Sequence, residues 1–194
     1  MPALAHRLIP SVSIILRPVQ NDDGELLLAI YASTRTEELA QVGWDDAEKE
    51  RFLRMQFDAQ RTFYQGEYPG AEFQIILVSG QPAGRLYVHR REKEIRIMDI
   101  ALLPAFRGRG IGTVLLNDIL AEGERTVRLV TIHVESFNPA QRLYQRLGFT
   151  KVASNGVYHL LEWTGQTGPR SNGEEHRSHP AQDRSPTDAA QSPK

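Results

Sequence analysis

The sequence predicts an α/β fold in which helices cover a mixed β-sheet. Two observations support this class. Segments with the apolar pattern of strands alternate along the chain with amphipathic segments of helical period. In addition, 194 residues with 40% hydrophobic and 24% charged side chains suffice for one domain with a substantial core, but not for two of ordinary size.

The first half of the chain is expected to contain one strand and two helices. SIILRP, residues 13–18, has a β-rich pattern and stops at a proline. The acidic loop 21–23 then supplies a start for the helix GELLLAIYAST. The segment DDAEKERFLRMQFDAQRTFYQ has acids at its head and apolar residues at helical spacing, so we expect a long amphipathic helix that ends near Gly66 or Pro69.

A hairpin and a third strand follow. FQIILVSGQPAGRLYVHRR consists of two apolar runs joined by the turn Ser79–Pro82, a pattern that predicts two antiparallel strands. The run IRIMDIALL, residues 95–103, reads as another strand that stops at Pro104.

The remaining elements alternate between helix and strand. The helix TVLLNDILAEG is expected to close at Gly123, and the apolar run 127–134 is expected to form a strand. A further helix should begin near Asn138 and Pro139, followed by a last strand over 156–163.

Three parts of the chain are expected: a short lead over 1–12, one domain over 13–164 and a polar tail over 165–194. The last apolar cluster, VYHLLEW, ends at Trp163. The tail has balanced charge and nothing to bury, so it is predicted to be disordered rather than a basic nucleic-acid arm. Its two histidines, His176 and His179, are interpreted as solvated, and no metal site is predicted.

Composition excludes several classes of function. The absence of cysteine excludes disulfides, thiolate metal sites and a cysteine nucleophile. The net charge of -1 provides no overall attraction to nucleic acid or to an anionic membrane, so phosphate binding would have to be local. The N-terminal residues do not resemble a signal peptide, and no stretch approaches the roughly 18 to 20 apolar residues of a membrane span. We therefore expect a cytoplasmic protein.

The stretch RGRGIG, residues 107–112, is the strongest local motif. Its glycine spacing does not match a dinucleotide fingerprint, and no Gly-Lys-Ser/Thr follows as in a P-loop. It occurs once, between a strand and a helix, which disfavours an RNA-binding repeat. A glycine-rich turn at a helix N-terminus exposes free backbone N–H groups, which suit a pyrophosphate. The alternative is a tight turn whose glycines serve backbone geometry alone.

The context of this stretch resembles the GNAT superfamily of N-acetyltransferases. In IRIMDIALLPAFRGRGIGTVLL, the family pattern Arg/Gln-x-x-Gly-x-Gly/Ala is matched by Arg107, Gly110 and Gly112. A second element, in NPAQRLYQRLGF, matches at Asn138 and Tyr144, among others. The resemblance is clearest over 95–149 and extends over 13–163. It implies a mostly antiparallel mixed sheet with a splayed parallel strand pair and helices on both faces.

The resemblance also implies a cofactor and a reaction. The co-substrate would be acetyl-coenzyme A (acetyl-CoA), with its pyrophosphate on the glycine-rich turn and its pantetheine arm along the preceding strand. The acetyl group would pass to a primary amine of a small molecule, peptide or protein by direct attack in a ternary complex. The residues implied in cofactor binding are Ile100, Ala101, Leu102, Arg107, Gly108, Arg109, Gly110, Ile111, Gly112, Thr113 and Asn138. Asn138 also suits a helix cap, which is the alternative for that residue.

Three residues are catalytic candidates. Tyr144 occupies the position of the family's usual general acid; packing on the core is the alternative. A tyrosine pKa near 10 makes proton transfer to a thiolate uphill by roughly 2 kcal/mol, so a depressed pKa or concerted transfer is required. For the base, His133 and Asp99 compete: His133 also suits a buried structural role, and Asp99 is a carboxylate in an apolar strand, which needs a partner or a task. Glu135 is interpreted as solvated.

Acceptor specificity is expected from the region 31–68. Its polar and aromatic residues include Arg35, Glu37, Glu38, Trp44, Asp45, Asp46, Arg61, Tyr64 and Tyr68. The four acids are interpreted as helix caps and first-turn charges rather than an amine-binding set. A non-catalytic acyl-CoA sensor or interaction module is the competing function, and acetylation of a nucleic acid is disfavoured by the neutral charge. A homodimer is suggested by the resemblance alone.

Overall fold

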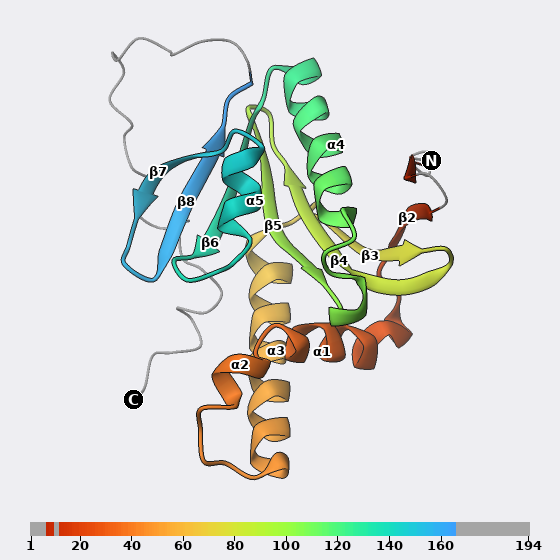
Figure 1. Cartoon of the computed structure of the whole chain (residues 1–194), viewed down its shortest axis with the longest axis vertical. Helices are drawn as coiled ribbons and strands as arrows, with labels where there is room; N and C mark the ends of the chain where they lie inside the picture. The colour runs from red at the N-terminus through yellow and green to blue at the C-terminus, as the bar shows by residue number, and fades with distance from the viewer. Residues whose placement is uncertain (1–6, 10–11, 166–194) are drawn as a thin grey trace.

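The computed structural model describes residues 7–9 and 12–165, and the tail prediction for 165–194 lies outside this range except at Gly165. One eight-stranded sheet runs through it, in the order β1-β2-β3-β4-β5-β6-β8-β7 (Figure 1). The strands are β1 (Arg7–Ile9), β2 (Val12–Pro18), β3 (Glu72–Val78), β4 (Gln81–Arg90), β5 (Glu94–Leu102), β6 (Leu129–Glu135), β7 (Thr150–Ser154) and β8 (Tyr158–Trp163). The α-helices are α1 (Gly24–Ser33), α2 (Thr36–Leu39), α3 (Asp46–Glu67), α4 (Ile111–Thr126) and α5 (Gln141–Arg146), with 3₁₀ turns at Asn21–Asp23 and Pro104–Phe106.

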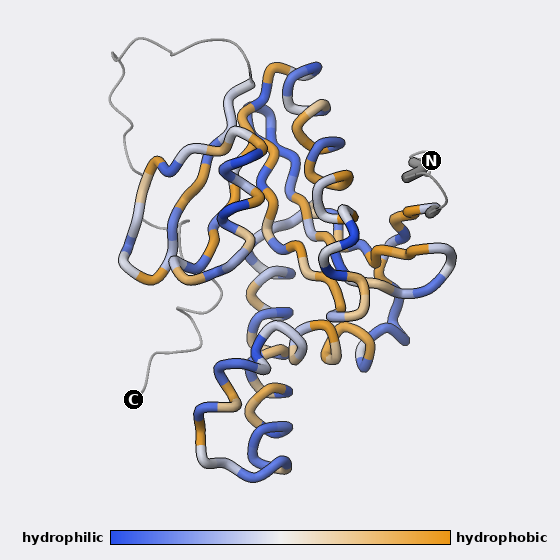
Figure 2. The backbone as a smooth tube through the Cα atoms, viewed as in Figure 1, coloured by the Kyte–Doolittle hydropathy of each residue, from blue (hydrophilic) through white to orange (hydrophobic). Residues whose placement is uncertain are grey.

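Helices cover both faces of the sheet, as expected. Because side chains alternate along a strand, neighbouring residues of β3 enter different cores: Ile76 packs under α4 and α5, whereas Ile75 packs under α1 and α3. Polar and apolar segments alternate along α4 in Figure 2, and its apolar stripe forms the centre of the first core.

The predicted mixed sheet with a splayed parallel pair is confirmed. All adjacent strands are antiparallel except β5 and β6, which pair in parallel only from Glu94–Leu129 to Ile97–Ile132. Both strands continue beyond that point without pairing to each other, and β5 stays bonded to β4 as far as Leu102. The splay therefore opens in the middle of the sheet.

The hairpin prediction is confirmed, and three smaller elements, α2, β7 and β1, were not predicted. Between β3 and β4, Ser79 and Gly80 both have positive φ, at 49° and 79°. The four-residue helix α2 is too short to show a period. The edge strand β7 has five exposed residues and so lacks the apolar alternation that marks a strand. Within the predicted lead, Arg7–Ile9 forms β1 against β2.

One helix boundary was predicted wrongly. The helix expected to close at Gly123 continues to Thr126, and Val127 ends it with φ of 53°. Gly123 is needed inside the helix for space, since a Cβ there would lie 2.8 Å from Val130 Cγ2 and 3.1 Å from the Arg128 carbonyl oxygen. The glycine thus allows a close approach to β6 rather than a C-cap.

No α-helix in the described part of the chain is long and apolar enough to span a membrane.

Candidate active site

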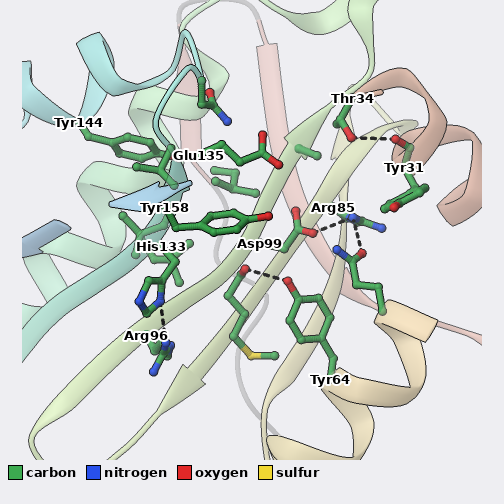
Figure 3. Close-up of a pocket in the computed structure, with 18 of the residues that line it drawn as sticks. Tyr31, Thr34, Tyr64, Arg85, Arg96, Asp99, His133, Glu135, Tyr144 and Tyr158 are labelled. Carbon is green, nitrogen blue, oxygen red and sulfur yellow. Dashed lines mark hydrogen bonds and ion pairs between the residues drawn. The ribbon is translucent and has the colours of Figure 1, made fainter. Parts of the chain in front are cut away.

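A cavity of about 180 Å³ lies where β5 and β6 part (Figure 3). A bulge lies in its wall: the β4–β5 register shifts between Tyr87 and Val88, which sets Met98 outside the regular pairing. The phenolic O–H of Tyr64, on α3, donates to the Met98 carbonyl oxygen at 3.1 Å. The bulge is thereby bonded to the helix layer, and the residue after it, Asp99, lines the cavity.

Asp99 is held by a buried arginine from the neighbouring strand. Arg85 Nη2 lies 2.6 Å from Asp99 Oδ2, and the Arg85 and Asp99 side chains are 2% and 14% exposed. Burial alone would lower the pKa of the Arg85 guanidinium, but Asp99 raises it above its ordinary value. Asp99, a carboxylate inside an apolar strand, is therefore paired through its Oδ2 atom. Its Oδ1 atom has no hydrogen-bond partner among the described residues.

The Arg85 guanidinium is itself fixed from several sides. Its Nη2 also donates to Gln60 Oε1 at 3.1 Å, and its Cζ lies 5.8 Å and 5.3 Å from the ring centroids of Tyr31 and Tyr87. Nε and Nη1 are buried without a hydrogen-bond partner among the residues that the structure describes. The two rings take the place of water around the cation.

His133 also meets an arginine in the cavity wall. Arg96 Nη2 lies 2.6 Å from His133 Nδ1. Because a guanidinium only donates hydrogen bonds, Nδ1 must accept, and the proton of the neutral ring is assigned to Nε2.

Glu135 forms a third pair of the same kind. Its Oε1 accepts from Arg35 Nη1 at 2.9 Å, and the two side chains are 17% and 16% exposed. The expectation that Glu135 is solvated is wrong, because β6 ends beside the loop after α1 and brings the carboxylate to Arg35. Burial opposes the charge of Arg35, yet Glu135 raises its pKa above the ordinary value.

Tyr144 lies on α5 at the edge of the cavity and is 4% exposed. Its ring packs edge-on against Phe149, with centroids 5.6 Å apart. Burial raises the pKa of its hydroxyl above the ordinary value, and the charge of Asp99 raises it further. A depressed pKa, one of the two conditions for proton donation by Tyr144, is not what this environment produces.

The glycine-rich turn leads directly into α4. Gly108 and Gly110 have φ of 72° and 79°, and a Cβ at either position would meet nothing within 4 Å. These glycines therefore satisfy backbone geometry and leave open space outside the turn. The first N–H groups of α4, from Ile111 to Thr113, point out of a helix N-terminus into that space.

The two arginines of the turn differ. Arg107 donates from Nε to the Leu102 carbonyl oxygen at 2.8 Å, and from Nη2 to the Ser33 carbonyl oxygen and Oγ at 2.9 and 3.1 Å. It thus ties the turn to the end of β5 and to the C-terminus of α1. Arg109 lies over the Phe106 ring, 5.6 Å from its centroid.

The free edge of β5 offers backbone groups beside this turn. Leu103 N donates to the Ala83 carbonyl oxygen on the β4 side at 2.8 Å. By the alternation of an antiparallel ladder, Ala101 also turns its amide groups toward β4, whereas Ile100 and Leu102 turn theirs toward the splay. The Leu102 carbonyl is taken by Arg107. Ile100 and the Leu102 N–H remain for an extended ligand.

Asn138 lines the cavity, and its Oδ1 accepts from the Ala140 backbone N–H at 2.9 Å. It therefore shapes the turn before α5, although α5 itself begins only at Gln141. Both roles considered for this residue, contact with a ligand and local capping, are compatible with its position.

Only some of the residues named in the expected acceptor region, 31–68, line the cavity. Of the residues singled out there, Arg35, Tyr64 and Tyr68 line the cavity. The acids behave as caps: Asp45 Oδ1 accepts from Glu48 N at 2.8 Å, and Glu37 and Glu38 lie in the first turn of α2. Arg61 lines a different cavity.

The family comparison agrees with this geometry. Residues 31–149 match the model of the Acetyltransferase (GNAT) family, which is more than half of the chain. The chain belongs to the GNAT acetyltransferase family. GNAT membership accounts for both the splayed strand pair and the glycine-rich turn, and it supports acyl transfer as the activity.

Individual relatives of this GNAT chain are distant. A 60-residue segment is 33% identical to the [ribosomal protein bS18]-alanine N-acetyltransferase of Haemophilus influenzae, and it covers 30% of this chain and 41% of that enzyme. The PaiA N-acetyltransferase of Thermoplasma acidophilum, solved with coenzyme A, superposes with a TM-score of 0.60 at 15% identity over 78% of this chain and 99% of that one. The Escherichia coli ribosomal-protein-S18-alanine N-acetyltransferase gives 0.51 at 18% identity over 77% and 90%. At such identities the structures show a shared fold.

Sequence reasoning missed the arginines that pair with the candidate bases in this GNAT chain. Arg85 lies in GRLYV and Arg96 in IRIMD, each a charged residue inside an apolar strand. The argument that singled out Asp99, that a buried charge needs a partner, applies equally to both. The same signal would have found them.

Proposed function

We propose that this chain is an acetyl-CoA-dependent N-acetyltransferase that acts on a primary amine of a small molecule or peptide by direct attack in a ternary complex. The observation that carries this is the cavity at the splay of β5 and β6. It brings Asp99, His133 and Tyr144 together between the free edge of β5 and the loop after α1. An amine and a thioester must meet in such a place for direct transfer.

The cofactor side of the site is built from backbone. The N–H groups of Ile111, Gly112 and Thr113 suit a pyrophosphate, because the helix dipole adds to their partial charge. The amide groups of Ile100 and the Leu102 N–H suit the amides of pantetheine, which would pair as an added strand. Acetyl-CoA would supply the acetyl group at the end of that arm, and a backbone N–H on the Ile100 to Leu102 segment would stabilise the oxyanion.

The amine side is built from carboxylates that arginines hold in place. Asp99 Oδ1 and Glu135 Oε2 have no bonding partner among the described residues, because the arginines take only the other oxygen of each group. These oxygens can bind an ammonium and align it. Asp99 is the favoured acceptor of the amine proton, directly or through water, since His133 Nδ1 already accepts from Arg96.

Tyr144 is the proposed proton donor to the departing thiolate. Its raised pKa keeps the hydroxyl protonated throughout the neutral range. Full transfer to a thiolate whose acid has a pKa near 8.5 is uphill by at least about 2 kcal/mol, so donation would have to accompany C–S cleavage. Of the two routes considered for this residue, the environment supports concerted transfer.

Calorimetry with acetyl-CoA and a thiol-release assay on a panel of amines test this function. We expect cofactor binding at micromolar concentration and thiol release that depends on the amine. Failure to bind the cofactor would reject the proposal. Binding without thiol release above the hydrolysis background, with every amine, would favour a non-catalytic acyl-CoA sensor instead.

A further inference from the structure

A second cavity of about 190 Å³ lies behind the reaction cavity, on the side of α1 and α3. The two share three lining residues, Gln60, Tyr64 and Arg85. These side chains form a wall between the two cavities. Within the wall, Arg85 donates a hydrogen bond to Gln60, and Tyr64 donates one to the backbone of β5. The second cavity therefore adjoins the reaction cavity across this wall, and its other nine lining residues have no role in the proposed acetyl transfer.

The walls of the second cavity combine aromatic surface with positive charge. Leu27, Phe57 and Phe73 supply apolar surface, and Arg61 and Arg85 supply charge. The side-chain amides that line it include Gln20 and Gln65. Among the described residues lining it there is no aspartate or glutamate.

The two arginines at this cavity differ, because Arg85 is paired with Asp99 and Arg61 is not paired with an acid in the described part of the chain. Arg61 is exposed at the rim and has no ion pair within the described part of the chain. Asp23, close in sequence to the rim residue Gln20, is committed to Arg17 at 2.7 Å. Asp99 pairs with the charge of Arg85 from the side of the reaction cavity. Two buried nitrogens of Arg85 nevertheless have no hydrogen-bond partner among the described residues. A cavity with this lining favours an anion over a neutral or cationic ligand.

We propose that the second cavity is a binding site for a small carboxylate that carries an aromatic or branched apolar group. The apolar group lies against Leu27, Phe57 and Phe73, and the carboxylate faces Arg61 and the amides at the rim. This site is not the reaction cavity at the splay of β5 and β6. The proposal does not depend on acetyl transfer, because the experiment that tests it measures ligand binding alone.

Calorimetry on the full chain with phenylacetate and phenylacetamide tests the charge requirement, because the two probes share the ring and differ in charge. We expect phenylacetate to bind at one site and phenylacetamide to bind at least about fivefold more weakly, since an ionised acceptor makes stronger hydrogen bonds. Equal affinity of the two probes, or no binding of phenylacetate, would overturn the proposal.

Two substitutions at the exposed rim locate the site. Gln65→Glu adds a negative charge on α3, and Arg61→Gln removes a positive one; each should weaken phenylacetate binding by roughly threefold, as expected for a solvent-screened charge. Gln81→Glu makes the same chemical change on the exposed hairpin, away from both cavities, and should leave the affinity unchanged. If Gln65→Glu and Arg61→Gln both bind phenylacetate like the parent chain, the anion lies elsewhere and the proposal fails.

Discussion

Arg85 and Asp99 form a 2.6 Å ion pair across adjacent strands, with the arginine side chain only 2% exposed. The pair stands in the wall between the two cavities. The bulge at Met98 makes it possible, because Asp99 is registered with Tyr87 rather than with Leu86 and therefore shares a face of the sheet with Arg85. A charge that each strand alone could not bury is thus buried by the two together.

Removing one charge of the Arg85–Asp99 pair should destabilise the fold more than removing both charges. Asp99→Asn leaves Arg85 buried without a counter-charge, and Arg85→Met does the same to Asp99, so each should lower the free energy of unfolding by about 3 kcal/mol. The double variant Arg85→Met/Asp99→Asn, which combines the two single changes, should recover most of that loss. Urea unfolding of the four chains measures the coupling; additive losses would show that the two charges do not depend on each other.

Tyr144→Phe should lower kcat roughly 100-fold, the smaller end of the usual effect of a general acid, with little change in the acceptor KM. The ring contact with Phe149 is retained, so stability should change by less than about 1 kcal/mol. The thiol-release assay measures the rate. Tyr87→Phe is the matched control, since Tyr87 lines the second cavity and not the reaction cavity. Equal rates for Tyr144→Phe and the parent chain would leave Tyr144 with its packing role alone.

Alkaline pH should destabilise the fold through its buried tyrosines. Burial raises the pKa of Tyr87 to about 12, and it raises the pKa of Tyr64 as well. The folded state then holds these protons more tightly than the unfolded state, in which the pKa is near 10. The stabilisation is complete below pH 10 and is lost as pH rises toward the folded-state pKa, by up to about 1.4 kcal/mol per pH unit for each group.

Urea unfolding between pH 8 and pH 12 measures this loss. Tyr87→Phe removes the part of this pH dependence that is due to Tyr87. The free energy of unfolding of the variant should therefore fall less steeply above pH 10 than that of the parent chain. Identical slopes would mean that Tyr87 is not protected from ionisation in the folded protein.

Gly110→Ala should destabilise the chain by about 1 to 2 kcal/mol, because a φ of 79° places Cβ against the following carbonyl. Gly110→Asn should cost less, since asparagine tolerates the left-handed region. Gly24→Ala is the control: its φ of -52° is helical and a Cβ there meets nothing within 4 Å, so alanine should be neutral or stabilising. Thermal unfolding that ranks Gly110→Ala with Gly24→Ala would contradict the strained turn.

Arg107→Met should lower stability by about 1 to 3 kcal/mol, because it removes three hydrogen bonds that tie the turn to Leu102 and Ser33. Arg109→Met removes a similar charge but only a ring contact with Phe106, and it should change stability by less than about 0.5 kcal/mol. Equal losses in the two variants would indicate that charge at the turn matters, and not the bonds of Arg107.

Elements with a strong period could be predicted, and elements without one could not. The amphipathic stripe of α4 and the turn at Ser79 and Gly80 are local signals, so their existence followed from the residues. The exposed strand β7 has no apolar alternation and was missed, although it pairs with β8. The prediction that the helix ends at Gly123 is wrong because the glycine is required by the close approach of Val130, which belongs to a neighbouring strand.

Periodicity, turn residues and motif spacing are properties of short stretches, so the residues alone predicted the architecture, the family resemblance and three candidates for the site, Asp99, His133 and Tyr144. The partners of the charged side chains became known only from the folded structure. Asp99, His133 and Glu135 each meet an arginine that is distant in sequence, Arg85, Arg96 and Arg35 respectively. Pairing of buried charge depends on which strands and loops become neighbours, and that is a consequence of the register and splay of the sheet.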